Sequence, residues 1–259
     1  TIMRDFLLTL YSYCILYISH LIHIPDDEIP LIGLKSDNAH FAGLVLARGG
    51  SKGIKLKNLS RINNVTLLTR TLNTMQKFGR FDSIWVSTDN EKIAEEAKLS
   101  PNVSVHHRAA YTATDTATSL IAVQEFLGQH PEVDMVALVQ CTSPFLRPEY
   151  LAKAYDAMMS GYHSIFSVTR QFKLRWKLTE ENKLIPDNFK AHSRPRRQDW
   201  RGEIIENGMF YMTYATIAME FNVLQGGRIG VVDIPPSESL EIDNINDLLL
   251  AEIIDLRRS

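Results

Sequence analysis

The chain has 259 residues, of which 45% are hydrophobic and 22% are charged, and its formal net charge is −2. This length suits one large domain with a sizeable core, and the charge gives no reason to expect nucleic acid as a partner. The two cysteines, Cys14 and Cys141, lie too far apart for a disulfide framework or a zinc-binding spacing. The adjacent His106 and His107 would point to opposite sides of a strand, which favours a surface position over metal ligation.

Residues 1–40 are predicted to form a segment of their own, ahead of a folded domain over residues 41–259. Residues 6–24 are strongly apolar and are followed by three acidic residues at 26–28. Their apolar core favours a secretory signal or membrane anchor, and their length barely reaches that of a bilayer span. His20 and His23 argue against a complete span, and an additional core helix is the alternative.

Residues 41–58, FAGLVLARGGSKGIKLKN, are the stretch around which the rest of the chain is expected to be organised. Residues 41–47 are all apolar or glycine, which is typical of a strand buried on both faces of a parallel sheet. A turn with three glycines follows, and Arg48, Lys52 and Lys57 give it positive charge. Glycines let the backbone approach a ligand closely, so this stretch favours phosphate binding. A solvated tight turn is the alternative, because one such motif is not specific.

Strands and helices are predicted to alternate as far as residue 169. Strands are expected at 83–87, 103–105, 133–140 and 164–169, and helices at 65–78, 90–98, 112–126 and 148–159. This order is typical of βαβ crossovers and predicts an α/β fold with a mostly parallel sheet. Ligands of such sheets bind outside the carboxyl ends of the strands. The loops at Arg48, Thr88, Arg108 and Gln140 are therefore expected to meet at one edge.

The alternation stops between residues 171 and 208, which are rich in Lys, Arg, Pro and Asn. This region is predicted to leave the sheet as a hairpin, a lid or a dimerisation arm. Its basic cluster suits bidentate recognition of a carboxylate or phosphate, although a solvated face fits equally well. The cluster consists of Arg194, Arg196, Arg197 and Gln198. Beyond it we expect a strand at 209–214, a helix at 215–224, a strand at 229–234 and a helix at 245–256.

Two carboxylates near the end of the chain are candidate ligands of a divalent cation. Glu241 and Asp243 are two residues apart in an extended segment, so their side chains would point to the same side. Mg²⁺ is usually held by one or two carboxylates together with substrate phosphates. Capping of the closing helix explains Asp243 equally well, and for Asp89 we expect capping of the helix at 90–98.

The turn QCTSP at residues 140–144 offers an amide and two hydroxyls after a buried strand. Such groups suit hydrogen bonding to a sugar or a base, and an ordinary Ser-Pro turn is the alternative. Neither the Walker P-loop pattern nor the dinucleotide GxGxxG pattern is present. No Ser/His/Asp arrangement stands out.

Taken together, the motifs resemble those of the CMP-sialic acid synthetases (N-acylneuraminate cytidylyltransferases) over most of residues 41–256. The resemblance rests on ARGGSKGIKLKN at 47–58, VSTD at 86–89, RAAYTATDTATS at 108–119, QCTSP at 140–144, RPRRQDW at 194–200 and ENG at 206–208. It implies a Rossmann-like nucleotidyltransferase fold with a protruding dimerisation arm at 171–208. It also implies that CMP is transferred from CTP to the anomeric hydroxyl of a sialic acid, with Mg²⁺ or Mn²⁺ as cofactor.

The resemblance further implies roles for individual residues. CTP would be bound by Arg48, Ser51, Lys52, Lys57, Asn58, Ser87, Arg108 and Ser119. The sialic acid would be bound by Gln140, Thr142, Ser143, Arg197, Gln198 and Asn207, the two arm residues coming from a neighbouring subunit of a homodimer or homotetramer. Catalysis would rest on Lys57, Arg48 and Asp243, and the metal would be bound by Glu241 and Asp243.

Two residues depart from the family pattern. Lys55 stands where a proline is usual, which adds charge to the loop, and Glu241 stands where an aspartate is usual, which would shift the metal geometry. A cytidylyltransferase for Kdo or another nonulosonic acid remains an alternative, as does a catalytically weak nucleotide-binding homologue. Vertebrate relatives are mostly nuclear and carry a second, phosphatase-like domain, whereas insect relatives are Golgi proteins. The apolar N-terminal segment favours the Golgi and possible membrane anchoring, with the nucleus as the alternative.

Overall fold

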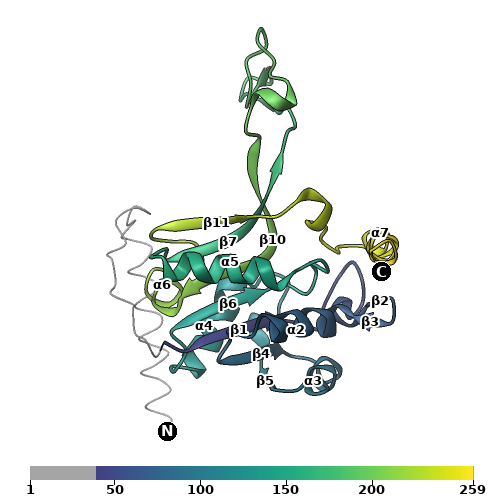
Figure 1. Cartoon of the computed structure of the whole chain (residues 1–259), viewed down its shortest axis with the longest axis vertical. Helices are drawn as coiled ribbons and strands as arrows, with labels where there is room; N and C mark the ends of the chain where they lie inside the picture. Colours follow the sequence, from purple (N-terminus) through teal and green to yellow (C-terminus); the bar gives the residue numbers. More distant parts are fainter. Residues whose placement is uncertain (1–38, 259) are drawn as a thin grey trace.

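The computed structural model describes residues 39–258 and is built on a seven-stranded sheet (Figure 1). The strand order is β11-β7-β10-β6-β1-β4-β5. All neighbouring strands run parallel except β10, which is antiparallel to both β6 and β7. The predicted α/β fold with a mostly parallel sheet is therefore confirmed.

The strands of this sheet are β1 (Phe41–Leu46), β4 (Ser83–Thr88), β5 (Val103–His107), β6 (Met135–Val139), β7 (Ser164–Gln171), β10 (Glu203–Tyr214) and β11 (Ile229–Asp233). The helices are α2 (Leu67–Phe78), α3 (Glu91–Lys98), α4 (Ser119–Gln129), α5 (Pro148–Met159), α6 (Ala215–Glu220) and α7 (Ile245–Leu256). Four short 3₁₀ helices are η1 (Lys57–Leu59), η2 (Ala110–Thr112), η3 (Arg197–Asp199) and η4 (Pro236–Glu238). Two small hairpins pair β2 (Arg61–Ile62) with β3 (Val65–Thr66) and β8 (Trp176–Leu178) with β9 (Leu184–Pro186).

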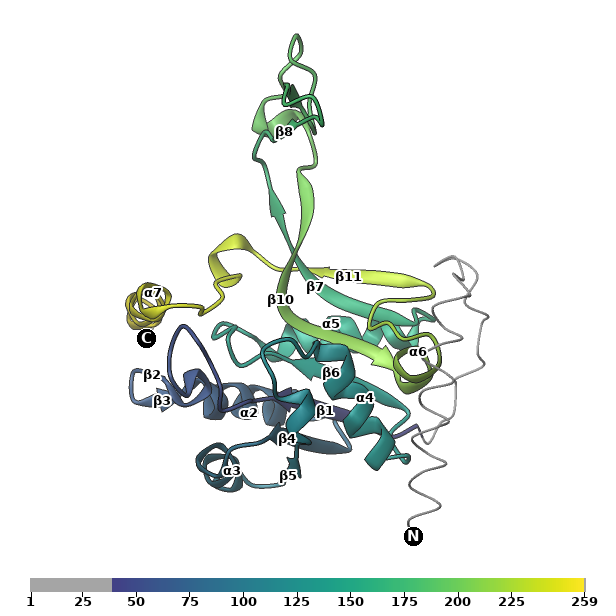
Figure 2. The same cartoon turned by 180° about the vertical axis from the view of Figure 1, so that it is seen from behind.

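The core lies on both faces of the sheet, as the uninterrupted apolar run of β1 predicts. Phe41 and Val45 pack with residues of α2 and α5, whereas Ala42 and Leu44 pack with residues of α4 and α6. Figures 1 and 2 show these helix pairs on opposite faces. Alternate residues of a strand point to opposite faces, so a strand covered on both sides must be apolar throughout. Full burial of a side chain such as Leu44 contributes about 1.5–3 kcal/mol.

The residues proposed to cap α3 and α7 were each one position too early. Asn90, not Asp89, caps α3 by accepting a hydrogen bond from the Lys92 backbone N–H at 3.1 Å. Asn244, not Asp243, caps α7 in a capping box with Asp247. Both acidic residues are thereby left free to make contacts outside their helices, and the structure shows such contacts for each.

Four other expectations differ from the structure. α4 begins at Ser119 rather than near residue 112, because residues 113–118 form a loop that ends with Thr118 as the helix cap. α6 ends at Glu220, short of residue 224. β10 begins at Glu203 rather than 209, because residues 203–206 continue to pair with β7. The predicted surface position of His106 is wrong, although His107 is exposed.

His106 is buried because its two ring nitrogens find polar partners inside the protein. Its Nε2 lies 2.8 Å from the Glu125 carboxylate, and its Nδ1 lies 3.3 Å from His130. The cost of burying a polar ring is offset by these hydrogen bonds. Within residues 39–258, no group of three or more His, Cys, Asp or Glu side chains is arranged to hold a metal ion.

Residues 172–202 form an arm that projects from the sheet (Figures 1 and 2). β7 and β10 continue beyond the other strands, and the β8–β9 hairpin lies in the projecting part. The predicted departure of this region from the sheet is confirmed, and its role in dimerisation stays a prediction.

The predicted signal or anchor segment lies outside the described residues, apart from its last two positions, and so does Cys14. Among residues 39–258, no helix is both long and apolar enough to cross a bilayer.

Candidate functional site

A cleft of about 400 Å³ opens at the carboxyl ends of β1 and β6. We call it the basic cleft. It brings together eight of the residues predicted from the sequence, contributed by the glycine-rich loop, the turn after β6 and the segment before α7. The eight are Arg48, Ser51, Lys52, Lys57, Asn58, Gln140, Thr142 and Asp243, and Leu46, Gly53 and Asp115 complete the lining.

Lys57 connects the two halves of the basic cleft. Its Nζ donates a hydrogen bond to the Ile242 carbonyl at 2.8 Å and lies 3.1 Å from the Asp243 carboxylate. The side chain is only 17% exposed, so its ammonium group is held at a defined position beside the cleft. Leu56, just before it, has a φ of 53°, in a region that non-glycine residues seldom adopt. Such backbone strain persists only where surrounding contacts hold it.

The loop requires a glycine at position 53, because the backbone there lies very close to Asp243. A Cβ added to Gly53 would lie 2.2 Å from the Asp243 carbonyl oxygen, which is far inside van der Waals contact. Gly49 is similarly close to Asn90, and its backbone N–H donates to Asp89 at 2.8 Å. These two glycines therefore serve close packing within the protein, in addition to any approach of a ligand.

Asp115 is a member of the basic cleft that the sequence analysis did not single out. One carboxylate oxygen lies 2.7 Å from Arg48 Nη1, and the other lies 3.0 Å from Lys52 Nζ. The hydrogen bonds from Lys52 and Arg48 lower the pKa of Asp115 below its ordinary value. The available signal was its position as the one acidic residue in the motif RAAYTATDTATS.

Asp243 lines the basic cleft, and Glu241 lies beside it, next to Thr142. Thr142 Oγ1 donates to Glu241 at 3.4 Å, and a Cβ on Gly208 would lie 3.6 Å from the same carboxylate. Loss of surrounding water raises the pKa of Glu241, and the negative charge of Asp243 raises it further. Two neighbouring carboxylates that repel each other fit a hard divalent cation, which prefers oxygen ligands. Water or substrate oxygens would have to complete its coordination.

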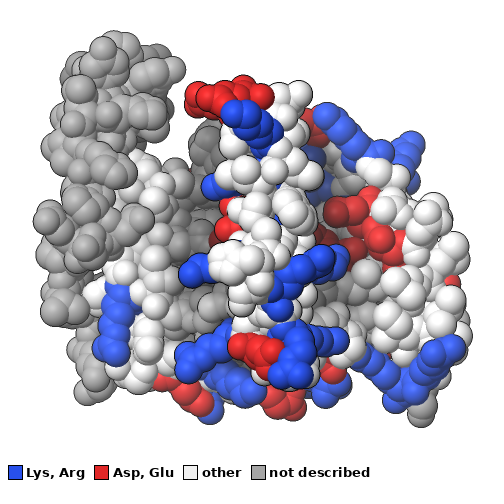
Figure 3. All heavy atoms as spheres, turned by 90° about the horizontal axis from the view of Figure 1, so that it is seen from above, with Lys and Arg blue, Asp and Glu red and all other residues white. Residues whose placement is uncertain are grey.

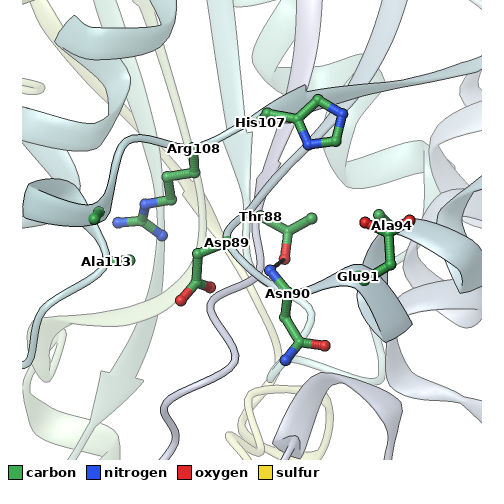
Figure 4. A pocket seen from close by; sticks show the side chains of 9 residues that line it. Thr88, Asp89, Asn90, Glu91, Ala94, His107, Arg108 and Ala113 are labelled. Carbon is green, nitrogen blue, oxygen red and sulfur yellow. Dashed lines mark hydrogen bonds between the residues drawn. The ribbon is translucent and has the colours of Figure 1, made fainter.

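A second cleft of about 400 Å³ adjoins the glycine-rich loop between β4 and β5. Arg108, Asp89 and His107 are among its lining residues, and Figure 4 shows Arg108 and Asp89 on the same side of it. Arg108 is fixed by hydrogen bonds to the hydroxyl and the carbonyl of Thr112. Burial lowers the pKa of the Arg108 guanidinium, against the opposing charge of Asp89, but arginine remains charged in proteins.

A third cleft of about 410 Å³ lies on the other side of Gln140, which borders both this cleft and the basic cleft. Ser119 at the start of α4 also lines it. Opposite them, Glu206 accepts hydrogen bonds from Tyr211 at 3.1 Å and from Gln225 at 2.8 Å. Burial and the neighbouring Glu206 charge raise the pKa of Tyr211 to about 12. Neither side chain was predicted from the sequence, because the motif ENG at 206–208 was considered only for Asn207 and Tyr211 lies beyond this motif.

Comparison with known protein families identifies the family to which these strands and loops belong. The family model described as "Cytidylyltransferase" matches residues 42–217, which include every strand of the main sheet except β11. The chain belongs to the cytidylyltransferase family.

Relatives of this cytidylyltransferase include N-acylneuraminate cytidylyltransferase A of Danio rerio, which is 41% identical over 217 residues. That alignment covers 82% of this chain and 50% of the relative, so the chain spans about half the length of that protein. The pseudaminic acid cytidylyltransferase of Campylobacter jejuni is 26% identical over 219 residues, covering 82% of this chain and 94% of the relative.

A solved structure similar to the cytidylyltransferase is that of CMP:2-keto-3-deoxy-manno-octonic acid synthetase complexed with CTP. It has a TM-score of 0.65 and 11% identity, with 85% of this chain and 100% of the other covered. At this identity the likeness concerns the fold alone, and it confirms the predicted Rossmann-like nucleotidyltransferase architecture.

The remaining predicted residues lie outside the basic cleft of this cytidylyltransferase. Ser87 and Ser143 are buried beneath the carboxyl edge of the sheet, and Asn207 donates to Ser239 Oγ at 3.0 Å while accepting from the Met209 backbone. Arg197 and Gln198 are exposed on η3 of the arm. In this single chain the arm residues are thus not brought together with the cleft residues.

Proposed function

We propose that the chain transfers CMP from CTP to the anomeric hydroxyl of a sialic acid, releasing pyrophosphate. The observation that carries this proposal is the basic cleft, where Arg48, Lys52 and Lys57 line one cavity that adjoins the carboxylates of Glu241 and Asp243. This arrangement suits a triphosphate with a divalent cation. The similarity to N-acylneuraminate cytidylyltransferase A supports a sialic acid as the acceptor.

The triphosphate would lie across the basic cleft, with Arg48 and Lys52 binding its outer phosphates. The oxygen of the anomeric hydroxyl attacks the α-phosphorus, its proton passes to water, and the bond from the α-phosphorus to the pyrophosphate oxygen breaks. Negative charge grows on the leaving pyrophosphate, and a cation fixed in advance stabilises it without reorganisation. Lys57 meets this requirement, because Ile242 and Asp243 hold its ammonium group in place.

We further propose that Mg²⁺ or Mn²⁺ is bound by Glu241 and Asp243. When bound, the cation neutralises phosphate charge and orients the triphosphate. Thr142 positions Glu241 through its hydroxyl, and Lys57 positions Asp243. The cation would also relieve the repulsion between the two carboxylates, which raises the pKa of Glu241.

The clefts on either side of the basic cleft suit the two other parts of the substrates. The cleft with Arg108 and Asp89 offers charged and backbone groups to the cytidine portion of CTP. The cleft shared by Gln140, Glu206 and Tyr211 offers hydrogen-bonding groups to the hydroxyls of an acidic sugar. Because Gln140 borders both this cleft and the basic cleft, the sugar would lie next to the phosphates.

We propose that the arm reaches a second subunit of a homodimer or homotetramer and supplies Arg197 and Gln198 to the carboxylate of the sugar there. The apolar side chains of Trp176, Leu178 and Leu184 are exposed on the arm, which is expected of a surface that another chain covers. Lys and Arg outnumber Asp and Glu between residues 171 and 202, and they flank the arm when it is viewed end-on (Figure 3).

We also propose that the protein belongs to the secretory pathway, most simply the Golgi, where CMP-sialic acid serves glycosylation. This proposal rests on the apolar residues 6–24 in the sequence alone. Fluorescence microscopy of the tagged chain, with and without residues 1–38, tests it. Nuclear signal from the intact chain would contradict it.

The test of the reaction is pyrophosphate release from CTP in the presence of Mg²⁺ or Mn²⁺ and one acidic sugar at a time. The panel contains N-acetylneuraminic acid, N-glycolylneuraminic acid, pseudaminic acid and Kdo. We expect release with a sialic acid. Release with pseudaminic acid or Kdo alone would reassign the acceptor. Pseudaminic acid is the second candidate, because of the similarity to the Campylobacter jejuni relative. No release with any sugar would indicate a nucleotide-binding protein.

A further inference from the structure

Asp115 lies between two of the cations that the proposed triphosphate would need. Its two carboxylate oxygens contact different side chains, Arg48 at 2.7 Å and Lys52 at 3.0 Å. Asp115 also lines the basic cleft itself, so its carboxylate lies inside the cavity rather than behind it. A bidentate oxygen anion in this position presents to Arg48 and Lys52 what one phosphate group would present.

We propose that Asp115 is an exchangeable anion of the basic cleft, which a phosphate group displaces from Arg48 and Lys52 on binding and which returns when pyrophosphate leaves. This inference rests on the proposed function, because it takes the basic cleft to be the triphosphate site. Asp115 thereby sets the affinity of the cleft for polyphosphates without contacting the reacting atoms.

The loop that carries Asp115 is fixed at both ends, and residues 114–116 between them are exposed. Thr112 is held by the hydrogen bonds from Arg108, and Thr118 caps α4 by accepting from the Ile121 backbone at 3.3 Å. The intervening residues 113–117 lie on the surface, and the Asp115 side chain is 41% exposed. A displacement of the Asp115 side chain would free both cations without requiring the other lining residues of the cleft to move.

The energetics also favour exchange over a permanent ion pair. Exposed ion pairs are weak, each contributing up to about fivefold to an equilibrium constant. Lys52 is 78% exposed, so its pair with Asp115 belongs to this class. A triphosphate carries several charges and displaces one carboxylate readily, whereas pyrophosphate carries fewer. Both ligands nevertheless break the same two ion pairs, so the carboxylate weakens the binding of substrate and product by a similar factor, and its return assists the release of pyrophosphate.

The acid–base properties of Asp115 agree with this role. The hydrogen bonds from Lys52 and Arg48 lower its pKa, so the carboxylate stays ionised and competes with phosphate throughout the neutral pH range.

The test is Asp115→Asn in the whole 259-residue chain, which removes the charge and keeps the shape. Binding of inorganic tripolyphosphate and of pyrophosphate is measured by calorimetry, without metal or sugar. We expect both to bind about 3- to 10-fold more tightly than to the unchanged protein. Asp115→Ala repeats the test without an amide, and Asp115→Glu, which keeps the charge, is expected to bind like the unchanged protein.

Asp156→Asn is the matched control. Asp156 lies on α5, away from the cleft, and its carboxylate is 2.6 Å from the Arg80 guanidinium. This variant therefore removes the same charge from a different part of the surface. We expect its polyphosphate affinity to be unchanged. Equal gains in Asp156→Asn and Asp115→Asn would reduce the effect to net charge and overturn the proposal.

Kinetics provide a second measurement that a merely structural role would not produce. In Asp115→Asn we expect the KM for CTP to fall and inhibition by pyrophosphate to strengthen by a similar factor. Weaker or unchanged polyphosphate binding would overturn the proposal, because Asp115 would then orient the cations or be idle. Since the binding measurement involves no turnover, an absence of activity with every sugar would refute the proposed reaction and leave the result on Asp115 separate.

Discussion

The basic cleft and the arm both carry clusters of basic side chains, but the chain holds them very differently. In the cleft, Lys57 is mostly buried and has two partners from a distant part of the chain. On the arm, Arg196 is exposed and pairs with Asp199 only three residues away, while Arg197 lies 5.0 Å above the Phe172 ring. The cleft is therefore organised by contacts within one chain, whereas the basic side chains of the arm are exposed and have only local partners.

The largest expected effect is that of removing the cation which joins the cleft halves. We expect Lys57→Ala to lower kcat for pyrophosphate release by at least about 100-fold, because a fixed charge at the leaving group is lost. Lys98→Ala is the matched control, since Lys98 pairs with Glu91 on the surface of α3. Circular dichroism should show the same fold for both variants. Near-normal turnover in Lys57→Ala would refute the assignment of Lys57.

A smaller but still large effect is expected from Gly53→Ala. The added methyl group cannot fit against the Asp243 carbonyl, so the loop and the acidic segment must move apart. We expect kcat/KM to fall by about 10- to 100-fold, because misplacement of catalytic groups by about 1 Å has costs of that order. Gly50→Ala is the control, because a Cβ at Gly50 meets no other atom within 4 Å. Equal activity of the two variants would show that the contact at Gly53 is unimportant.

A third prediction concerns the basic side chains of the arm. We expect Arg197→Ala to raise the KM for the sialic acid about 10-fold while leaving the KM for CTP nearly unchanged. Lys183→Ala, which changes an exposed lysine paired with Glu181, should have no effect.

Mixing Lys57→Ala with Arg197→Ala subunits tests whether Arg197 acts at the cleft of its own subunit or at that of a neighbouring subunit. If the arm reaches a neighbouring subunit, a mixed dimer has one site with both residues intact, and about a quarter of the normal activity should return when the sialic acid concentration is well below its KM. No recovery after unfolding and refolding the mixture would mean that each arm serves its own cleft.

The smallest expected effect concerns the stability of the acidic segment. Because the pKa of Glu241 is raised, the folded protein holds this proton more tightly than the unfolded chain does, and stability falls as pH rises through that pKa. We therefore expect Glu241→Gln to raise the Tm by about 1–3 °C at pH 7.5 without divalent cations. The difference should vanish near pH 4, where the glutamate is protonated in both states.

Addition of Mg²⁺ completes that experiment. It should raise the Tm of the unchanged protein more than that of Glu241→Gln, because the variant offers one carboxylate fewer. Glu95→Gln, at an exposed position on α3, is the control for a lost surface charge. Equal Tm shifts of Glu241→Gln and the unchanged protein with Mg²⁺ would argue against a cation at Glu241.

The sequence predicted the sheet and the composition of the basic cleft well, because both depend on local patterns. The apolar run of β1 and the glycines and cations after it are consecutive in the chain. The carboxyl ends of parallel strands meet at one edge, so the turns at Arg48 and Gln140 were expected together, and the structure confirms that they are.

What the sequence did not predict depends on partners far along the chain. Asp115 meets Arg48 across 67 positions, and Asp89 is drawn from its expected capping role toward the Gly49 backbone across 40 positions. The burial of His106 could not be predicted, because its partners Glu125 and His130 lie on and beyond a helix whose facing side the sequence does not show. Such pairings follow from the tertiary arrangement and leave no periodic signal in the sequence.

The contact between Lys57 and Asp243 has a consequence for how the protein is made. The two residues are 186 positions apart, so on the ribosome the glycine-rich loop emerges long before the segment that holds its lysine. The β1 strand is synthesised early, but the ammonium group of Lys57 gains its partners only after Ile242 and Asp243 have been made. The cleft thus becomes complete only after residue 243 has been made, and a nascent chain that stops before this residue has the loop without its anchor.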